Sequence, residues 1–239
     1  MSVDLLAIVA HPDDAELLCG GTLARAAGGK YRTGILDLSA GELGSSGSPE
    51  QRAAEAQTAA NILGVAERVT AALPDGAIRD SHQARRKVVS LVRQLRPRMV
   101  ITHWPRARHP DHGAACRLAR ASCFLAGLKR FPADGEPHRP HKLLYALTYQ
   151  EAWIRPSFVV DITDQMEQKL DAIFAFQTQF SGRIAMGDVM PGGERLLREQ
   201  IRAHHAHYGS WIRREYGEPF WTKEVMAVND VPGLEVSSF

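Results

Sequence analysis

The sequence predicts an α/β protein with a Rossmann-like, mostly parallel sheet and helices on both faces of that sheet. Three observations predict this class. Short segments of strand length alternate with longer segments whose apolar residues recur at helical spacing. The first short segment, Val3–Ala10, is almost entirely apolar, which is typical of a parallel strand buried on both faces. The chain has 239 residues, of which 44% are hydrophobic, so it is long enough to bury the core of one such domain.

The first half of the chain supplies most of the expected elements. Val3–Ala10 predicts the first strand, and a helix should follow it, with Pro12 at the first helical position and an end near Gly28 and Gly29. Later strands are predicted at Tyr31–Leu38, Arg68–Leu73 and Arg98–His103, and later helices at Glu50–Leu63, Ser81–Leu95 and Ala114–Ala126. Strands that alternate with helices in this way form a parallel sheet with right-handed crossovers.

The second half is expected to belong to the same single domain, spanning residues 1–239. The sequence predicts strands at Lys142–Thr148 and Ser157–Ile162, a helix at Gln165–Phe176 and a loop at Gly182–Gly193. No stretch has the composition of a disordered linker. Residues 132–239 are therefore expected to complete the edge of the sheet and the rim of any site there.

The charge balance argues against several classes of partner. Lys and Arg number 29 against 27 Asp and Glu, so the net charge of +2 gives no general reason to bind nucleic acid or a membrane. The N-terminal apolar run reaches His11 too soon for a signal peptide, and a cytoplasmic protein is expected. Basic residues of Ser81–Leu95, among them Arg93, are expected to form a solvated face. Cys19 is expected to be a small buried residue.

Two polar clusters follow predicted strands directly. The first is AHPDDAE, which begins at Ala10, and the second is RHPDHG, which begins at Arg108. Because the carboxyl ends of parallel strands meet at one edge of a sheet, we expect the two clusters to lie together. They offer five candidate groups besides Asp111, namely His11, Asp13, Asp14, His109 and His112. Two imidazoles and a carboxylate make a typical three-ligand catalytic zinc site.

The spacing of these residues limits which of them can bind the metal, but it does not decide between His109 and His112. His11 and Asp14 are three residues apart across a strand-to-helix turn, so both can face one point, while Asp13 can face a water molecule there. His109 and His112 are also three apart, so one of them can bind the metal while the other faces the substrate.

Three other interpretations compete with a catalytic metal site. Proline and aspartate are ordinary at helix starts, but helix capping requires no histidine and does not explain two such clusters. A nucleotide-binding module would place glycines in the first turn, whereas this turn holds Asp13 and Asp14, and Gly20 and Gly21 come too late. A non-catalytic metal site would favour four protein ligands, with no spare acid–base groups such as Asp13 and His109.

The two clusters resemble the signature of the LmbE-like, PIG-L type zinc-dependent N-acetylglucosaminyl deacetylases. The bacillithiol-biosynthesis branch, whose substrate is N-acetylglucosaminyl malate, is the most similar. That similarity rests on LPDG at 73–76, the Ser/Gly loop before Arg52, VVDIT at 159–163, QTQF at 177–180 and YGSWIRREYGEPF at 208–220. The resemblance implies an LmbE-like fold and removal of an acetyl group from an amino-sugar conjugate.

The resemblance also implies residue roles. His11, Asp14 and His112 match the ligands of Zn²⁺, for which Fe²⁺ is an alternative with the same donors. Asp13 matches the general base that activates water, and His109 matches the residue that stabilises the oxyanion and protonates the leaving amine. Asp111 matches a residue that tunes a neighbouring histidine. The family further implies a small-molecule substrate and a homo-oligomer, with a hexamer favoured.

Substrate-binding residues are expected outside the two clusters. Ser39–Pro49 is rich in Gly and Ser and long for a loop in a compact domain, which indicates a functional loop. The expected substrate contacts are Arg52 just after this loop, Glu42 within it, Arg108 and Tyr208, with Tyr216 competing for the role of the oxyanion tyrosine. His204, His205 and His207 do not share one helix face, so they are expected to form a surface helix end rather than a second metal site.

Overall fold

A computed structural model describes residues 2–44, 46–149, 154–180 and 196–230. Its strands are β1 (Leu5–Val9), β2 (Thr33–Asp37), β3 (Glu67–Thr70), β4 (Met99–Thr102), β5 (Lys142–Ala146), β6 (Phe158–Asp161) and β7 (Gly217–Trp221). Its helices are α1 (Asp14–Gly28), α2 (Pro49–Leu63), α3 (His82–Leu95), α4 (Pro110–Ala126), α5 (Met166–Phe174) and α7 (Leu197–Trp211), with a 3₁₀ turn η1 at Thr163–Gln165. The predicted loop at Gly182–Gly193 lies outside the described residues.

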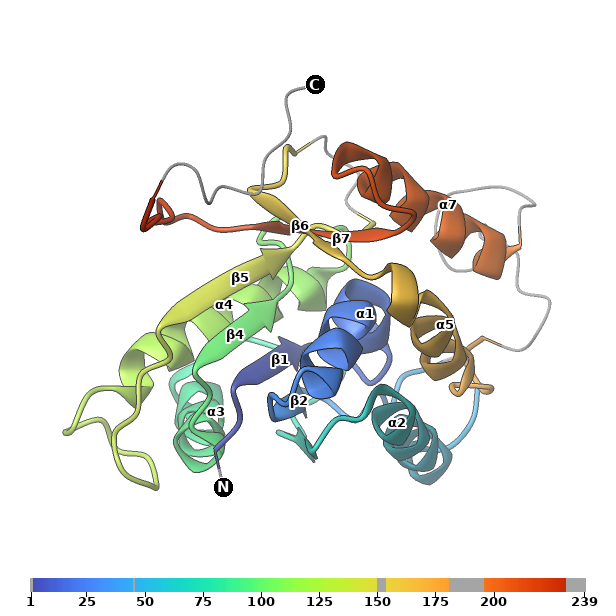
Figure 1. The fold of residues 1–239 in the computed structure, drawn as a ribbon. Coiled ribbons are helices and arrows are strands. Elements are labelled where there is room, and N and C mark those ends of the chain that lie inside the picture. The colour runs from blue at the N-terminus through green and yellow to red at the C-terminus, as the bar shows by residue number, and fades with distance from the viewer. Residues whose placement is uncertain (1, 45, 150–153, 181–195, 231–239) are drawn as a thin grey trace.

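The strands form one seven-stranded sheet in the order β3-β2-β1-β4-β5-β7-β6 (Figure 1). β1 to β5 are mutually parallel, whereas β7 runs antiparallel to both of its neighbours, β5 and β6. The predicted class, an α/β fold with a mostly parallel sheet, is confirmed. β7 was not predicted, because GEPFW contains a proline and lacks a clear apolar alternation.

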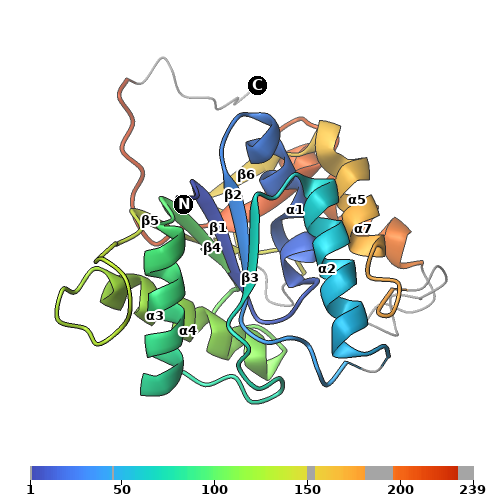
Figure 2. The same ribbon diagram turned by 90° about the horizontal axis from the view of Figure 1, so that it is seen from below.

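Helices cover both faces of the sheet, which Figure 2 shows nearly edge-on. On one face, α3 and α4 pack Val88 and Leu118 in the same cluster as Leu6 and Ile8 of β1. On the other face, α1 packs against the alternate residues of β1, and α2, α5 and α7 add a further apolar layer around α1. Alternate side chains of a strand point to opposite faces, so β1 must be apolar throughout. No helix among the described residues is long and apolar enough to cross a membrane.

The start of α1 differs from the prediction. Pro12 precedes the helix instead of occupying its first position, because Asp13 adopts a left-handed backbone conformation with φ 111° and the helix begins at Asp14. A non-glycine residue in this region is strained and is retained where the surrounding structure demands it. Helix α4, in contrast, begins earlier than predicted, at Pro110, so the HPDH segment forms its N-cap and first turn.

Two expectations for basic and histidine-rich segments are wrong. Arg93 is buried, not solvated, because its guanidinium donates hydrogen bonds to the carbonyl oxygens of Ala126, Leu128 and Ala133 and so satisfies the backbone that follows α4. His205 is also fully buried, and its Nδ1 lies 3.0 Å from the carbonyl oxygen of Gly217 in β7. The periodicity of a helix cannot show that a later strand covers one of its polar residues.

Candidate active site

The carboxyl ends of β1 and β4 bring the two predicted clusters together. His11, Asp13 and Asp14 follow β1, while His109 is the N-cap of α4 and His112 lies in the first turn of that helix. The imidazole ring of His11 lies 5.0 Å from that of His109 and 5.5 Å from that of His112, measured between ring centroids. The topology of the sheet therefore joins segments that are about a hundred residues apart in the sequence.

Asp14 lies at the centre of the cluster. One of its carboxylate oxygens, Oδ2, lies 3.2 Å from His11 Nδ1 and accepts a hydrogen bond from the backbone N–H of His11 at 2.8 Å. The other oxygen, Oδ1, lies 3.1 Å from His112 Nε2. Two imidazole nitrogens and a carboxylate converge here, and this donor set suits Zn²⁺. Among the described residues, His112 shares one compact set of possible ligand atoms with His11 and His109 and another with Asp14 and His103. The predicted residues therefore have the chemistry of a divalent-metal site, although the three together are not one of these compact sets.

The carboxylates and imidazoles of this cluster shift one another's pKa values. Burial works to raise the pKa of Asp14, but the charge of His112 and the hydrogen bonds from His11 and His112 hold that pKa well below its usual value. Burial works to lower the pKa of His11, yet the carboxylates of Asp14, Asp75 and Asp13 raise it to about 9. Asp14 is therefore ionised at neutral pH, and the metal-free site carries a protonated His11.

Asp13 lies beside this cluster and is paired with an arginine. Arg52 Nη2 donates to Asp13 Oδ2 at 2.8 Å, and Arg52 Nη1 donates to the carbonyl oxygen of Gly41 at 2.8 Å. Burial and the charge of Asp14 raise the pKa of Asp13 to about 7, although Arg52 works against this rise. A carboxylate with a pKa near neutral is suited to general acid–base catalysis.

The Ser/Gly loop wraps closely around Arg52. A Cβ atom on Gly41, whose φ is +69°, would lie 2.7 Å from Arg52 Nη1, and one on Gly44 would clash with the same nitrogen. These two positions therefore require glycine. The third nitrogen of the guanidinium, Nε, is buried and has no partner among the described residues. Arg52 therefore contacts the predicted base directly, and its Nε–H is not hydrogen-bonded to any described residue.

His109 is exposed and poised as a hydrogen-bond donor. Its Nδ1 accepts a hydrogen bond from the backbone N–H of Asp111 at 3.2 Å, so a neutral ring carries its proton on Nε2. Partial burial and the positive charges of His112 and His11 lower the pKa of His109, which favours this neutral form. The ring stacks on His112 at 4.8 Å, which directs it toward the cluster.

Two carboxylates hold the far side of the His11 ring. His11 Nε2 lies 3.0 Å from Asp75 Oδ1 and 3.3 Å from Asp111 Oδ2. Asp111 is buried and also accepts hydrogen bonds from the backbone N–H groups of Gly76 and Ile78. A histidine that binds a metal usually donates its other N–H to a carboxylate, which fixes the orientation of the ring. Asp111 therefore lies within reach of the His11 ring, and its tuning role stays a prediction.

Sequence reasoning missed Asp75 and His103. Asp75 lies in LPDG, a segment whose local pattern predicts only a turn, and His103 directly follows β4. His103 is 1% exposed, stacks on His112 at 4.2 Å, and accepts a hydrogen bond at Nε2 from the backbone N–H of Ala10 at 2.9 Å. Burial and the charge of His112 lower the pKa of His103 to about 3, so it stays neutral. The signal for both residues was their position at the end of a predicted strand.

The other predicted substrate residues are more dispersed. Glu42 is exposed, and its Oε1 accepts a hydrogen bond from the backbone N–H of Asp75 at 2.9 Å, which places it next to the cluster. Arg108 is exposed beside His109. Tyr208 lies on α7, where its ring contacts are with His204, His207 and Trp211. Tyr216 packs against the apolar layer around α1 and α5.

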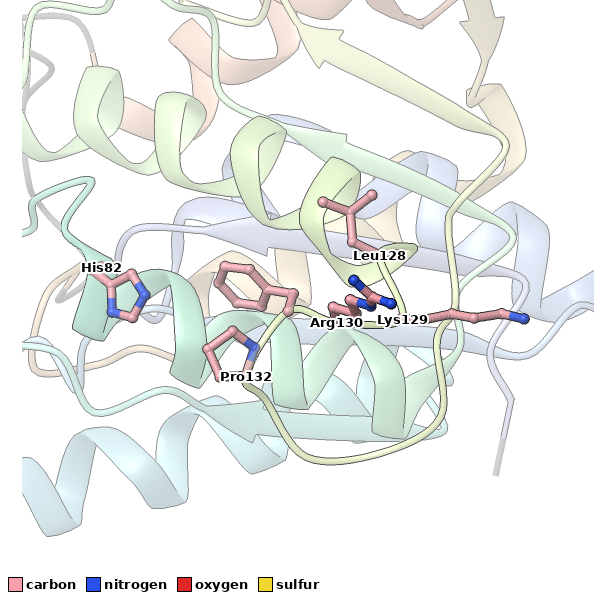
Figure 3. A pocket seen from close by; sticks show the side chains of 6 residues that line it. His82, Leu128, Lys129, Arg130 and Pro132 are labelled. Carbon is pink, nitrogen blue, oxygen red and sulfur yellow. The ribbon is translucent and has the colours of Figure 1, made fainter.

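A depression elsewhere on the surface is separate from this cluster. It has a volume of about 480 Å³ and is lined by His82, Leu128, Lys129, Arg130, Phe131 and Pro132 (Figure 3). It lies where the segment after α4 packs back on α3, and it includes none of the predicted site residues.

The fold and the site together define a class of enzyme, a metal-dependent N-deacetylase that hydrolyses a carbon–nitrogen bond. More specifically, the chain belongs to the PIG-L family of LmbE-like deacetylases. The family model described as PIG-L, GlcNAc-PI de-N-acetylase, matches residues 6–123. That stretch contains both polar clusters, and the family predicted from them is confirmed.

Known relatives match beyond the two clusters. The crystal structure of the conserved protein TT1542 from Thermus thermophilus is 41% identical with a TM-score of 0.84, covering 95% of this chain and 98% of that one. The diacetylchitobiose deacetylase of Thermococcus kodakarensis is 29% identical, covering 96% of this chain and 84% of the relative. The 1D-myo-inositol 2-acetamido-2-deoxy-alpha-D-glucopyranoside deacetylase of Rhodococcus opacus is 32% identical, and this chain spans 62% of its length. The chain is a deacetylase of an N-acetylglucosaminyl-type substrate.

Proposed function

We propose that this chain removes the acetyl group of an N-acetylglucosaminyl conjugate at the site formed by His11–Asp14 and His109–His112. One observation carries the proposal: the two carboxylate oxygens of Asp14 lie 3.2 Å from His11 Nδ1 and 3.1 Å from His112 Nε2, beside the Asp13–Arg52 pair. We assign Zn²⁺ to His11, Asp14 and His112, with Fe²⁺ as the alternative that suits the same donors.

The residues around this site have complementary roles in amide hydrolysis. A bound divalent ion polarises the acetyl carbonyl and lowers the pKa of water. Asp13 accepts a proton from the attacking water, and its pKa of about 7 allows it to return that proton to the departing amine. His109 donates a hydrogen bond from Nε2 to the oxygen that becomes negative. We assign protonation of the leaving amine to Asp13 rather than to His109. The lowered pKa of His109 favours its neutral ring, which is a poor general acid.

The aglycone of the substrate is the finer part of the proposal. The sequence favours N-acetylglucosaminyl malate, and we keep this conjugate as the first candidate. The names of the relatives add diacetylchitobiose and the inositol conjugate as alternatives. Arg52, which lies beside Asp13, supports recognition of a hydroxyl or carboxylate next to the acetyl group, since guanidinium donors suit both. Glu42, Arg108 and Tyr208 are proposed to contact the sugar or aglycone.

The decisive experiment measures acetate release by the zinc-loaded chain from the three conjugates. We expect release, and fastest release from the malate conjugate. Asp13→Ala should retain zinc and lose hydrolysis, because the metal-binding residues remain while the base is gone. Absence of acetate from all three conjugates, or full activity of Asp13→Ala on any of them, would overturn the proposal. A preference for chitobiose or the inositol conjugate would overturn only the assignment of malate.

The assembly is a separate proposal. We propose a homo-oligomer, with a hexamer favoured by similarity to the family. Light scattering on the protein as it elutes from a size-exclusion column measures its mass directly. A mass near that of one 26.3 kDa chain would contradict the proposal.

A further inference from the structure

Helix α1 is broken one turn after the metal-binding residues. The backbone of Cys19 has φ −149° and ψ 21°, which are not helical values. A helix normally pairs the N–H of residue i with the carbonyl oxygen of residue i−4. At this break the N–H groups of Gly21 and Thr22 and the carbonyl oxygens of Leu17 and Leu18 are bonded to other partners. The segment Asp14–Leu18 is therefore a short piece of helix, separate from the rest of α1.

All four of these backbone groups are satisfied by side chains from the second half of the chain. Glu218 accepts from the N–H of Gly21 at 2.9 Å and from the N–H of Thr22 at 2.7 Å. Lys169 Nζ donates to the carbonyl oxygen of Leu17 at 2.8 Å and to Glu218 Oε1 at 2.6 Å. Thr148 Oγ1 donates to the carbonyl oxygen of Leu18 at 2.9 Å. The side chains thus replace the two missing helical hydrogen bonds.

The Lys169–Glu218 pair is costly to bury. Both residues are 0% exposed, and a buried ion pair is often no more stabilising than apolar residues of the same size. Stability alone therefore gives little reason for a lysine and a glutamate here. Their hydrogen bonds are directed at the break in α1, and this geometry indicates a specific role in shaping the helix.

We infer that Lys169 and Glu218 are positioning residues for the metal site. By holding α1 open at Cys19, they set the direction of the Asp14–Leu18 piece, and with it the placement of Asp13 and Asp14 against the histidines. In the middle of this piece, Arg68 Nη1 donates to Glu16 Oε1 at 2.6 Å. Buried charges thus contact the piece at its middle and at its carboxyl end. The kinetic part of this inference rests on the proposed deacetylase function, whereas the metal-binding part does not.

The test uses the double variant Lys169→Met/Glu218→Gln, which removes both charges and leaves neither one unpaired. We expect its zinc affinity, measured by competition with a chelator, to fall about 10–100-fold, the range typical of residues that orient metal ligands. With saturating zinc, kcat should fall while KM changes little, because Asp13 is displaced but the Ser39–Pro49 loop is not. The single variant Lys169→Arg keeps the charge, so its losses of zinc affinity and kcat should be smaller than those of the double variant.

Two controls separate positioning from stability. Leu170→Ala removes a fully buried neighbour of Lys169 on α5 and destabilises the same layer without touching the break. Glu167→Gln removes an exposed ion pair between α5 and α7. Both should bind zinc like the wild type.

The inference is overturned if the double variant, once folded, binds zinc and turns over like Leu170→Ala. If the double variant does not fold, Thr148→Val decides the question, because it keeps the shape of the side chain and removes the hydroxyl that donates to the Leu18 carbonyl. A several-fold loss of zinc affinity in Thr148→Val supports the inference, and unchanged affinity overturns it. A wild-type protein that binds zinc but deacetylates none of the three conjugates contradicts the proposed function alone, since zinc affinity still reports on positioning.

Discussion

Arg52 Nη2 donates a hydrogen bond to Asp13 Oδ2 at 2.8 Å, with both side chains largely buried. The sequence predicted Arg52 as a substrate contact, and the structure places it on the proposed base. An arginine that stabilises a carboxylate lowers its pKa. Arg52 therefore opposes the rise that burial and Asp14 impose on the pKa of Asp13.

Replacing Arg52 should shift the pH dependence of catalysis. Asp13 acts as a base only when ionised, so kcat/KM falls as the pH decreases through its pKa. In Arg52→Gln that pKa rises, so the acidic limb of the kcat/KM profile should move upward by on the order of one pH unit. Arg85→Gln, which removes a surface ion pair with Asp80, is the control and should leave the profile in place. An unchanged acidic limb in Arg52→Gln would show that the pair does not tune the base.

Metal binding should release a proton from His11. In the metal-free protein the pKa of His11 is raised to about 9, so its ring is protonated at about pH 7.5, whereas a metal ligand must be neutral. Zinc titrations in buffers of different ionisation enthalpy should therefore report release of about one proton from this group. The apparent affinity should increase from about pH 6.5 to 8.5. A binding enthalpy independent of the buffer would contradict the assignment of His11 as a ligand.

Asp75 should contribute to zinc affinity although it was not predicted as a site residue. Its Oδ1 lies 3.0 Å from His11 Nε2, and its Oδ2 accepts the N–H of Leu43 at 2.9 Å. Asp75→Asn keeps the shape but removes the charge that orients the ring, and we expect zinc affinity to fall about 10–100-fold. Asp80→Asn, five residues further along, is the matched control. Equal affinities for the two variants would rule out this role.

Arg68 should be essential for stability. Its guanidinium donates to both oxygens of Asp37, at 2.7 and 3.0 Å, and to Glu16, and the side chains of all three residues are buried. Arg68→Met leaves two buried carboxylates unpaired, so the free energy of unfolding should fall by about 3–5 kcal/mol at pH 8.

The loss in Arg68→Met should depend on pH. Burial already raises the pKa values of Glu16 and Asp37, and Arg68 opposes this rise. Without Arg68 both pKa values rise further, so the destabilisation is fully present above them and decreases as the carboxylates take up protons at lower pH. Urea unfolding of the wild type and Arg68→Met at about pH 8 and pH 5.5 measures the loss in free energy of unfolding at each pH. Glu16→Gln, which leaves the Arg68–Asp37 pair intact, should be milder, and an equal loss in the two variants would contradict this explanation.

The sequence by itself determined the alternation of strands and helices from β1 to α5 and the two polar clusters, but neither α7 nor β7. Two local patterns can be recognised without knowledge of the fold. They are the apolar run of β1 with AHPDD directly behind it, and the RHPDHG segment after β4. These patterns predicted a metal site, and the resemblance to the family implied His11, Asp14 and His112 as its ligands and Asp13 as the base. The topology rule for parallel sheets then placed both clusters at one edge, as the structure has them.

Only the tertiary structure decided how these residues are held. The contacts of Asp75 with His11, of Arg52 with Asp13, and of Glu218 with the break in α1 join positions 64, 39 and roughly 200 residues apart. No periodicity or spacing records such pairs, because each partner reads locally as a turn residue, a helix arginine or part of an irregular strand. These contacts matter because the fold buries them. Burial strengthens the interaction between two charges and makes a buried charge without a partner costly.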